Sequence, residues 1–555
     1  MFKDLPFDDI HIMEAGSAPV ISALCQDLGL PQTINANVSW DEKQCNLAPG
    51  TLVMALIINI LHGRSPLYRV AESFVEQDTQ LLFGPGVEYS DLNDDALGRM
   101  LDKIADAGAK KVFSTVALQA QLKEEIAVNA LHLDTTARLV YGKYKGEGTL
   151  HITRGYNKEH RHDLKQFKVG LGVNKDGFPY FGEVMDGNKD DKSWNKQVLE
   201  KLPELADNLE KIIYVADSAM VTEGNLAIVQ RRNLSFISRL PATFALTAEL
   251  VDNAFTQGQW EDLGALSPGK NRARYKIQEF KAILYGQSYR FVVVSSSHLD
   301  KRKLKSLDKR IKQEKEQLTK EIKQLTRLRF ACEPDAKEAI LRFLKEKRGG
   351  FHPLSGTVEA VLEKKKRTSR GRPARDEEPQ YQQTYRINVE VGKLDEEALD
   401  RAKERLSCFV LISNVKNLSS RGILKEYKEQ TVVEERFKFI KHPLYVGPMF
   451  LKQKERMEAL SYIILMALMV YIILQRRARM SLENETEPLV ITGGKTTFSP
   501  TGNKILELLK PVKILCLKEK HLVVKRFLPE NYHILARALN LIGFGLDVYV
   551  KGRGP

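Results

Sequence analysis

The sequence has 555 residues, which is more than one ordinary domain holds, and its 43% hydrophobic content excludes wholesale disorder. The net charge of +14 is concentrated in one segment: residues 301–375 hold 24 Lys and Arg against 10 Asp and Glu, and the rest of the chain holds 61 of each sign. This distribution excludes a uniformly basic surface and predicts one segment that meets a polyanion, most simply nucleic acid.

Residues 1–125 are predicted to form an all-helical N-terminal domain. The first ten residues are acidic and lack the apolar stretch that a signal peptide carries, so no signal peptide is expected. Apolar residues follow a helical pattern over 52–61 and 112–122, and Asn93 or Asp94 can cap a helix between them. Such a domain could dock a helix in a DNA groove. Because no clear helix-turn-helix spacing is present, a role in packing or dimerisation is an equal alternative.

Residues 126–240 change to the pattern of a mixed α/β layer. Helices are predicted over 194–209 and from the Thr222 cap to residue 232. The expected strands cover 128–136, 148–153, 167–173, 178–185, 211–217 and 234–240. The order of these elements resembles that of the ribonuclease-H-like fold, so this segment is expected to be the first part of a catalytic domain.

Residues 241–406 are predicted to be an insertion in that domain. Strand-like pieces cover 273–280, 289–295 and 385–391, and a long charged helix covers 300–330. A basic loop contains Lys364, Lys365, Lys366 and Arg367. The helix is either a solvated coiled-coil arm or a DNA contact, and the shortage of acidic residues favours DNA.

Residues 407–480 are predicted to complete the catalytic domain, and 481–555 to form a C-terminal α/β region. A strand is expected over 408–412, with helices over 421–440 and 453–475. The apolar run 459–475 is shorter than the roughly 20 residues that span a bilayer. It therefore indicates a buried core helix and no membrane contact.

Two of the predicted strands carry an aspartate at or near their ends, Asp134 and Asp217. The carboxyl edge of an α/β sheet is where functional side chains reach solvent. Carboxylates placed there can hold a pair of Mg²⁺ ions about 4 Å apart for an in-line phosphoryl displacement. Mg²⁺ prefers hard oxygen ligands, and no Cys or His cluster in the sequence indicates a softer metal.

The predicted helix 421–440 offers a third carboxylate, Glu434. Tyr427, Gln430 and Lys441 lie seven residues before, four before and seven after it, which places all four on one helix face. Tyr, Gln and Lys side chains can hold the phosphates of a strand along that face. Glu435 lies about 100° round the helix and is expected to be a solvated neighbour.

This set of residues resembles the DDE transposases of bacterial insertion sequences, in the large group with the YREK signature. Tyr427, Glu434 and Lys441 match the spacing of that signature, with Gln430 where the pattern has Arg. The segments 131–136, 214–220 and 155–166 are similar to other parts of the family, and the resemblance covers roughly residues 90–510. It implies a ribonuclease-H-like catalytic domain with a β-rich insertion between the second and third acids.

The resemblance also implies a reaction. Asp134, Asp217 and Glu434 would bind two Mg²⁺ ions, with Mn²⁺ able to substitute. Water would cut the DNA at the element ends, and the freed 3′-OH would attack target DNA by direct transesterification. Arg161 and Lys165 are expected to contact the DNA backbone. An alternative metal role for the polar pair His160 and His162 lacks a third ligand at a suitable spacing.

The implied partner is double-stranded DNA, bound by a homodimer in the bacterial cytosol. Five scattered cysteines without a CxxC pair fit a reducing compartment. Two alternatives remain open. One is a catalytically inactive or domesticated relative that only binds DNA, and the other is a structure-directed metal nuclease that does not join strands.

Overall fold

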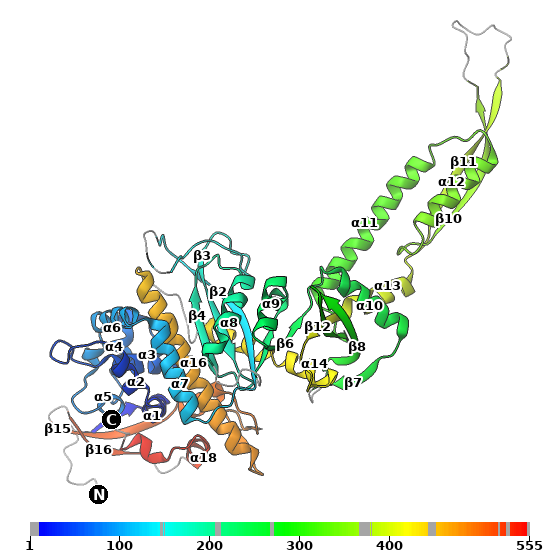
Figure 1. Ribbon diagram of the computed structural model, residues 1–555. Coiled ribbons are helices and arrows are strands. Elements are labelled where there is room, and N and C mark those ends of the chain that lie inside the picture. The colour runs from blue at the N-terminus through cyan, green and yellow to red at the C-terminus, as the bar shows by residue number, and fades with distance from the viewer. Residues whose placement is uncertain are drawn as a thin grey trace. The chain divides into compact units, whose positions relative to one another are not determined.

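The computed structural model describes residues 10–144, 148, 150–205, 212–266, 271–365, 378, 380–441, 451–519, 522–528 and 533–551. The chain has a mixed α/β architecture and divides into two compact units (Figure 1). The first unit comprises Met1–Arg239, Ser413–Leu418 and Gly422–Pro555, and the second comprises Leu240–Ile412 and Ser419–Arg421. The five-segment division expected from the sequence stays a prediction.

The first unit contains the strands in the order β4-β3-β2-β5-β6. These are β2 (Ala130–Val140), β3 (Lys165–Val173), β4 (Pro179–Met185), β5 (Ile213–Ala216) and β6 (Ser235–Arg239). β2, β3 and β4 pair antiparallel, whereas β5 is parallel to both β2 and β6. The helices α8 (Asp191–Leu205) and α9 (Glu223–Arg231) lie on either side of β5 in the sequence, and the Thr222 side chain caps α9 as predicted.

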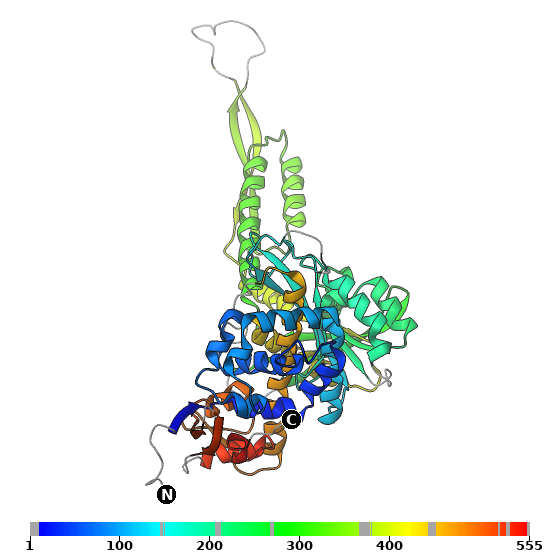
Figure 2. The same ribbon diagram turned by 90° about the vertical axis from the view of Figure 1, so that its left-hand side faces the viewer.

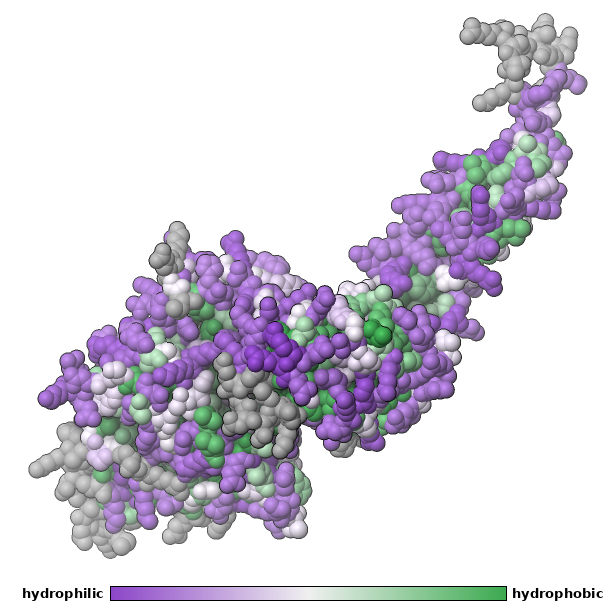
Figure 3. Space-filling view, viewed as in Figure 1, coloured by the Kyte–Doolittle hydropathy of each residue, from purple (hydrophilic) through white to green (hydrophobic). Residues whose placement is uncertain are grey.

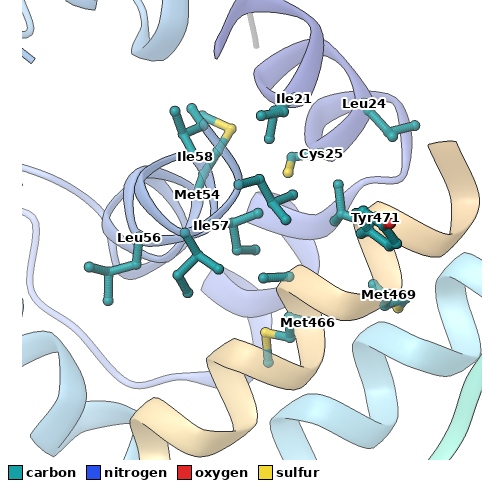
Figure 4. Packing of buried hydrophobic residues seen from close by; sticks show 14 of the residues in the cluster. Ile21, Leu24, Cys25, Met54, Leu56, Ile57, Ile58, Met466, Met469 and Tyr471 are labelled. Carbon is teal, nitrogen blue, oxygen red and sulfur yellow. The ribbon is translucent and has the colours of Figure 1, made fainter. Parts of the chain in front are cut away.

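A long apolar helix, α16 (Lys454–Glu483), organises the core of the first unit. The N-terminal helices that contact it are α1 (Ala18–Asp27), α3 (Pro49–His62), α6 (Asp94–Asp106) and α7 (Ala109–Lys123), with α2 (Leu30–Asn37) packed on α3. Figure 4 shows Ile57 of α3 and Met466 of α16 in this shared cluster. By length and composition α16 could cross a membrane, but 89% of its most apolar window is buried.

The N-terminal segment departs from the all-helical prediction. Its strand β1 (Ile10–Glu14) pairs antiparallel with β15 (Lys513–Glu519), which in turn pairs with β16 (Leu522–Phe527). In Figure 2 this blue strand lies beside the red C-terminal strands. The partner is some 500 residues away in the sequence, and five residues are too short a pattern to predict a strand from alternation. The N-terminal helices also share one hydrophobic core with α16 and the C-terminal helices α17 (Gly502–Leu509) and α18 (His533–Leu541).

The second unit has a sheet and an arm. The strands β7 (Glu261–Ala265), β8 (Arg274–Leu284), β9 (Gln287–Ser296) and β12 (Cys408–Ser413) follow the order β12-β9-β8-β7, accompanied by α10 (Ala245–Gln257) and α13 (Glu396–Ser407). The arm consists of α11 (Lys301–Leu325), α12 (Glu333–Glu346) and the hairpin of β10 (Leu354–Lys364) and β11 (Tyr381–Val391). Its small core contains Ala336, Ile340 and Ile387, and its visible face is mostly hydrophilic (Figure 3).

The strand predicted over 148–153 is wrong. Only Thr153 forms a β-bridge, with Gln166, and the described residues before it lie in no strand. The backbone N–H of His151 donates to Asp186 Oδ1 at 2.7 Å, so a side chain takes the place of a ladder partner. Local apolar content therefore did not predict where this segment finds its hydrogen bonds.

The first unit depends on a buried ion network around Arg477 of α16. Its Nη2 lies 2.6 Å from Asp27 Oδ2 and 2.5 Å from Glu124 Oε1, and the Glu124 side chain is 7% exposed. Replacing Arg477 by Met leaves Glu124 buried without this partner and should lower the free energy of unfolding by about 3–5 kcal/mol. Urea denaturation measures this change.

Arg456→Met on the same helix is the matched control. Arg456 pairs with Asp102 at 2.6 Å, but the side chains are 30% and 42% exposed, so the loss should be about 1 kcal/mol or less. Equal losses in the two variants would contradict a special role for the Arg477 network.

Candidate active site

The register of three neighbouring parallel strands places functional side chains in a row. Leu133 of β2 pairs with Ala216 of β5, and Ala216 pairs with Ser238 of β6. The next residue of each strand is Asp134, Asp217 and Arg239. Because neighbouring strands are about 4.8 Å apart, these three residues lie side by side at the edge where the parallel pairing ends.

The sequence suggested that Asp134 lies at the end of its strand, but in the structure the strand continues beyond it. β2 continues to Val140 because it pairs antiparallel with β3, from His132 opposite Val173 to Val140 opposite Lys165. Only the parallel pairing with β5 stops at Leu133. Asp134 is thus presented by a strand that is held firmly on one side.

Both aspartates are largely buried, and their charges are poorly offset. Burial raises the pKa of Asp134 to about 7, with Asp217 and Asp191 adding to the effect and Lys158 opposing it. Burial likewise raises the pKa of Asp217, although its Oδ1 accepts a hydrogen bond from the N–H of Ala219 at 3.1 Å. Two buried carboxylates therefore share Lys158 as the cation that lowers both pKa values.

Sequence reasoning missed three charged residues of this site: Lys158, Asp191 and Arg239. Asp191 begins α8 and accepts a hydrogen bond from Thr135 Oγ1 at 2.6 Å. Its charge raises the pKa of both Asp134 and Asp217. Of these three residues, only Arg239 could have been found from the sequence, because it ends the strand that neighbours the strand before Asp217.

The helix predicted over 421–440 is two helices, α14 (Ser420–Lys428) and α15 (Thr431–Lys441). At the break the N–H of Gln430 bonds to Tyr427 O and that of Val433 to Gln430 O, both at 3.2 Å and both three residues apart. The β-branched run of residues 431–433 has low helix propensity, which favours a break here. The single helix face proposed for Tyr427, Gln430, Glu434 and Lys441 is therefore wrong.

The break fixes both helices against β2. Gln430 Nε2 donates to the Leu133 carbonyl at 3.3 Å, directly before Asp134. In addition, Glu426 Oε1 of α14 lies 3.1 Å from Nε2 of the fully buried His132. Gln430 thus contacts the backbone that carries the first acid.

Tyr427 links the three predicted acids electrostatically. Burial raises its pKa to about 12, Arg239 opposes the shift, and the charges of Asp217, Glu434 and Asp134 add to it. Glu434 itself is exposed at the start of α15. Among the described residues, no three His, Cys, Asp or Glu side chains lie close enough to form a metal-binding group, so Glu434 does not join the two aspartates in one.

The residues that were predicted to bind DNA differ in their contacts and in their exposure. Lys441 forms an ion pair with Glu159, whereas Arg161 is paired with Asp163 at 2.7 Å. Lys165 donates to the Lys143 carbonyl at 2.5 Å. Lys364 and Lys365 are exposed at the end of β10 in the second unit, and Lys366 and Arg367 lie outside the described residues.

Comparison with protein families explains this arrangement. Residues 134–470, more than half of the chain, match the family described as Transposase DDE domain. The chain belongs to the DDE transposase family. The match begins at Asp134 and contains Asp217, Glu434 and the whole of the second unit, so both units are part of this transposase.

The N-terminal part has a separate match. Residues 10–118 match a domain of unknown function, DUF4277. A comparison with curated proteins gave no match. Transposase function and DNA as the partner therefore follow from the family alone.

The raised pKa of Asp134 predicts an unusual pH dependence of stability in metal-free protein. The folded state holds the proton up to a pH of about 7 and the unfolded chain only to about 4, so stability should fall as pH rises between these values. Asp134→Asn removes the buried charge. It should be the more stable protein at pH 8, by at most about 4 kcal/mol, and close to the parent at pH 5.

Urea denaturation at the two pH values measures this difference. Asp163→Asn is the control, because that aspartate is fully exposed and lies outside the buried pair. An Asp134→Asn variant that is less stable than the parent at pH 8 would contradict the unfavourable burial of the charge.

Proposed function

We propose that the protein is a transposase of a bacterial insertion sequence, in the YREK group, which cuts DNA at the element ends and joins them to target DNA. The observation that carries the proposal is the adjacency of Asp134 and Asp217, fixed by strand register, with Tyr427 in electrostatic reach of both and of Glu434. The strand order β4-β3-β2-β5-β6, with β5 and β6 parallel to β2, supports a ribonuclease-H-like catalytic domain.

The residues fit a divalent cation. Carboxylate oxygens are the ligands that Mg²⁺ and Mn²⁺ prefer. Burial raises the pKa values of Asp134 and Asp217, so a bound cation would favour their charged forms. These two aspartates would hold Mg²⁺, and Glu434, which forms no metal-binding group with them in the described structure, would have to approach them to complete the site. Such ions activate the attacking oxygen and stabilise the leaving oxygen of a phosphoryl transfer.

The side chains around the acids would position the DNA. Arg239, in line with Asp134 and Asp217, supplies a guanidinium that suits a phosphate next to the reacting one. Gln430 holds the start of α15 against β2 through its hydrogen bond to the Leu133 carbonyl, so it positions Glu434. An Arg at this position of the signature would instead make a charged contact with a phosphate.

The remaining parts of the proposal concern partners. The basic segment 301–375 lies within the second unit and would supply much of the sequence-independent grip on double-stranded DNA. Action on two element ends favours a homodimer in the DNA complex. The place of action would be the bacterial cytosol.

The test uses labelled element ends incubated with Mg²⁺, resolved into nicked, hairpin and joined products. Asp134→Asn and Glu434→Gln should each lower strand cleavage by at least about 100-fold while end binding changes little, because each removes a ligand of the metal. Glu435→Gln is the matched control, since it removes the same charge from an exposed neighbour on α15. Cleavage retained in Asp134→Asn would overturn the assignment of the site.

A second candidate function is a relative that binds DNA without cutting it. The observation that favours it is that the described residues form no three-carboxylate metal group. End binding by the parent protein, with no cleavage in Mg²⁺ or Mn²⁺, would support this candidate. Cleavage without joined products would instead indicate a metal nuclease.

A further inference from the structure

Arg64 is a partly buried cation that forms no ion pair with the described residues. It follows α3, and its Nη1 is buried with no hydrogen-bond partner among those residues. Burial lowers the pKa of Arg64 to about 10, and the charge that adds to this shift is another cation, Arg138. A guanidinium nitrogen that is buried without a hydrogen-bond partner is costly, and a bound anion would offset that cost.

Arg138 connects this cation to the candidate active site. It lies on β2 four residues after Asp134, and side chains four residues apart on a strand share one face. That spacing is about 13 Å along the strand. Arg138 Nη1 also donates to the carbonyl of Ile440 at 3.2 Å, near the end of the helix α15 that starts beside Glu434. Arg138 thus shares a strand with Asp134 and contacts the helix that carries Glu434, while its charge acts on Arg64, which follows α3.

A cavity of about 260 Å³ adjoins Arg64 and reaches the surface. Its lining includes Asn59, Ser65 and Tyr68, and the Tyr68 side chain is 64% exposed. Asp94 and Asp95 also line this cavity, but the charge of Asp95 acts on Arg456, which is already paired with Asp102. The charge of Asp95 thus acts on Arg456, and neither Asp94 nor Asp95 is among the causes of the lowered pKa of Arg64.

We propose that Arg64 and Arg138 bind a backbone phosphate of the DNA strand that extends from the acids along β2. A guanidinium is the side chain best suited to a phosphate, because its donors match two oxygens at once. The bound phosphate lies about two to four nucleotides from the one at the acids. The inference rests on the proposed function. It also means that the N-terminal segment matched at residues 10–118, which contains Arg64, contacts the DNA.

The experiment compares Arg64→Gln with the parent protein on element-end DNA in which single phosphates are replaced by neutral methylphosphonates. Binding is measured without metal, so that it does not depend on cleavage. Arg64→Gln should weaken binding about 10-fold and lower the slope of log affinity against log salt by about one. One methylphosphonate position should weaken binding by the parent but not by Arg64→Gln.

Arg69→Gln is the matched control. It removes the same charge from the same segment, but Arg69 is exposed and paired with Glu72 at 2.6 Å, so its affinity should change less than about twofold. Thermal unfolding is the second measurement. Because the buried charge is uncompensated in the free protein, Arg64→Gln should unfold at the same temperature as the parent or higher.

The outcomes separate the two hypotheses. A parent protein that binds no element ends overturns the proposed function. A parent that binds and cuts, with Arg64→Gln equally sensitive to methylphosphonate at every position, overturns the phosphate site alone. Lower thermal stability of Arg64→Gln would show a structural arginine and also overturn it. Stabilisation by inorganic phosphate that requires Arg64, without coupling to any DNA position, would assign the site to free phosphate and overturn the DNA contact.

Discussion

The candidate site depends on the parallel pairing of β2 with β5, which ends at Leu133 and Ala216. Because consecutive residues in parallel strands stay in step, this one register brings Asp134 and Asp217 together. A shift by one residue would turn one aspartate to the opposite face. The antiparallel partner β3 and the Gln430 bond to the Leu133 carbonyl hold β2 in that register and attach the third element to it.

Much of the site could be predicted because its signals are local. The short apolar strand before Asp217 and the Thr222 cap are read from a few neighbouring residues, and both are present in the structure. The break between α14 and α15 could not be predicted from helical spacing alone. It depends on a contact between Gln430 and Leu133, nearly 300 residues apart, added to a weak local preference of the β-branched run.

The same reason explains the missed residues. Lys158, Asp191 and Arg239 carry no motif by themselves. Their importance follows from where the turn before β3, the helix α8 and the strand β6 place them around two buried carboxylates. β1 is a similar case, since its only partner strand lies at the far end of the sequence. Pairings of this kind are set by the packing of the whole first unit around α16, which no window of sequence contains.

Buried charge in the first unit is of two kinds, and the difference indicates function. Arg477 and Lys123 together balance the charges of Asp27 and Glu124, as expected of a structural network. Asp134 and Asp217 have too little positive charge near them, and Arg64 has a second cation near it. Perturbed and unbalanced groups cluster at functional sites because a ligand supplies the missing charge. β2 carries both Asp134 and Arg138, so a metal ion and a DNA phosphate would each bind a side chain of the same strand.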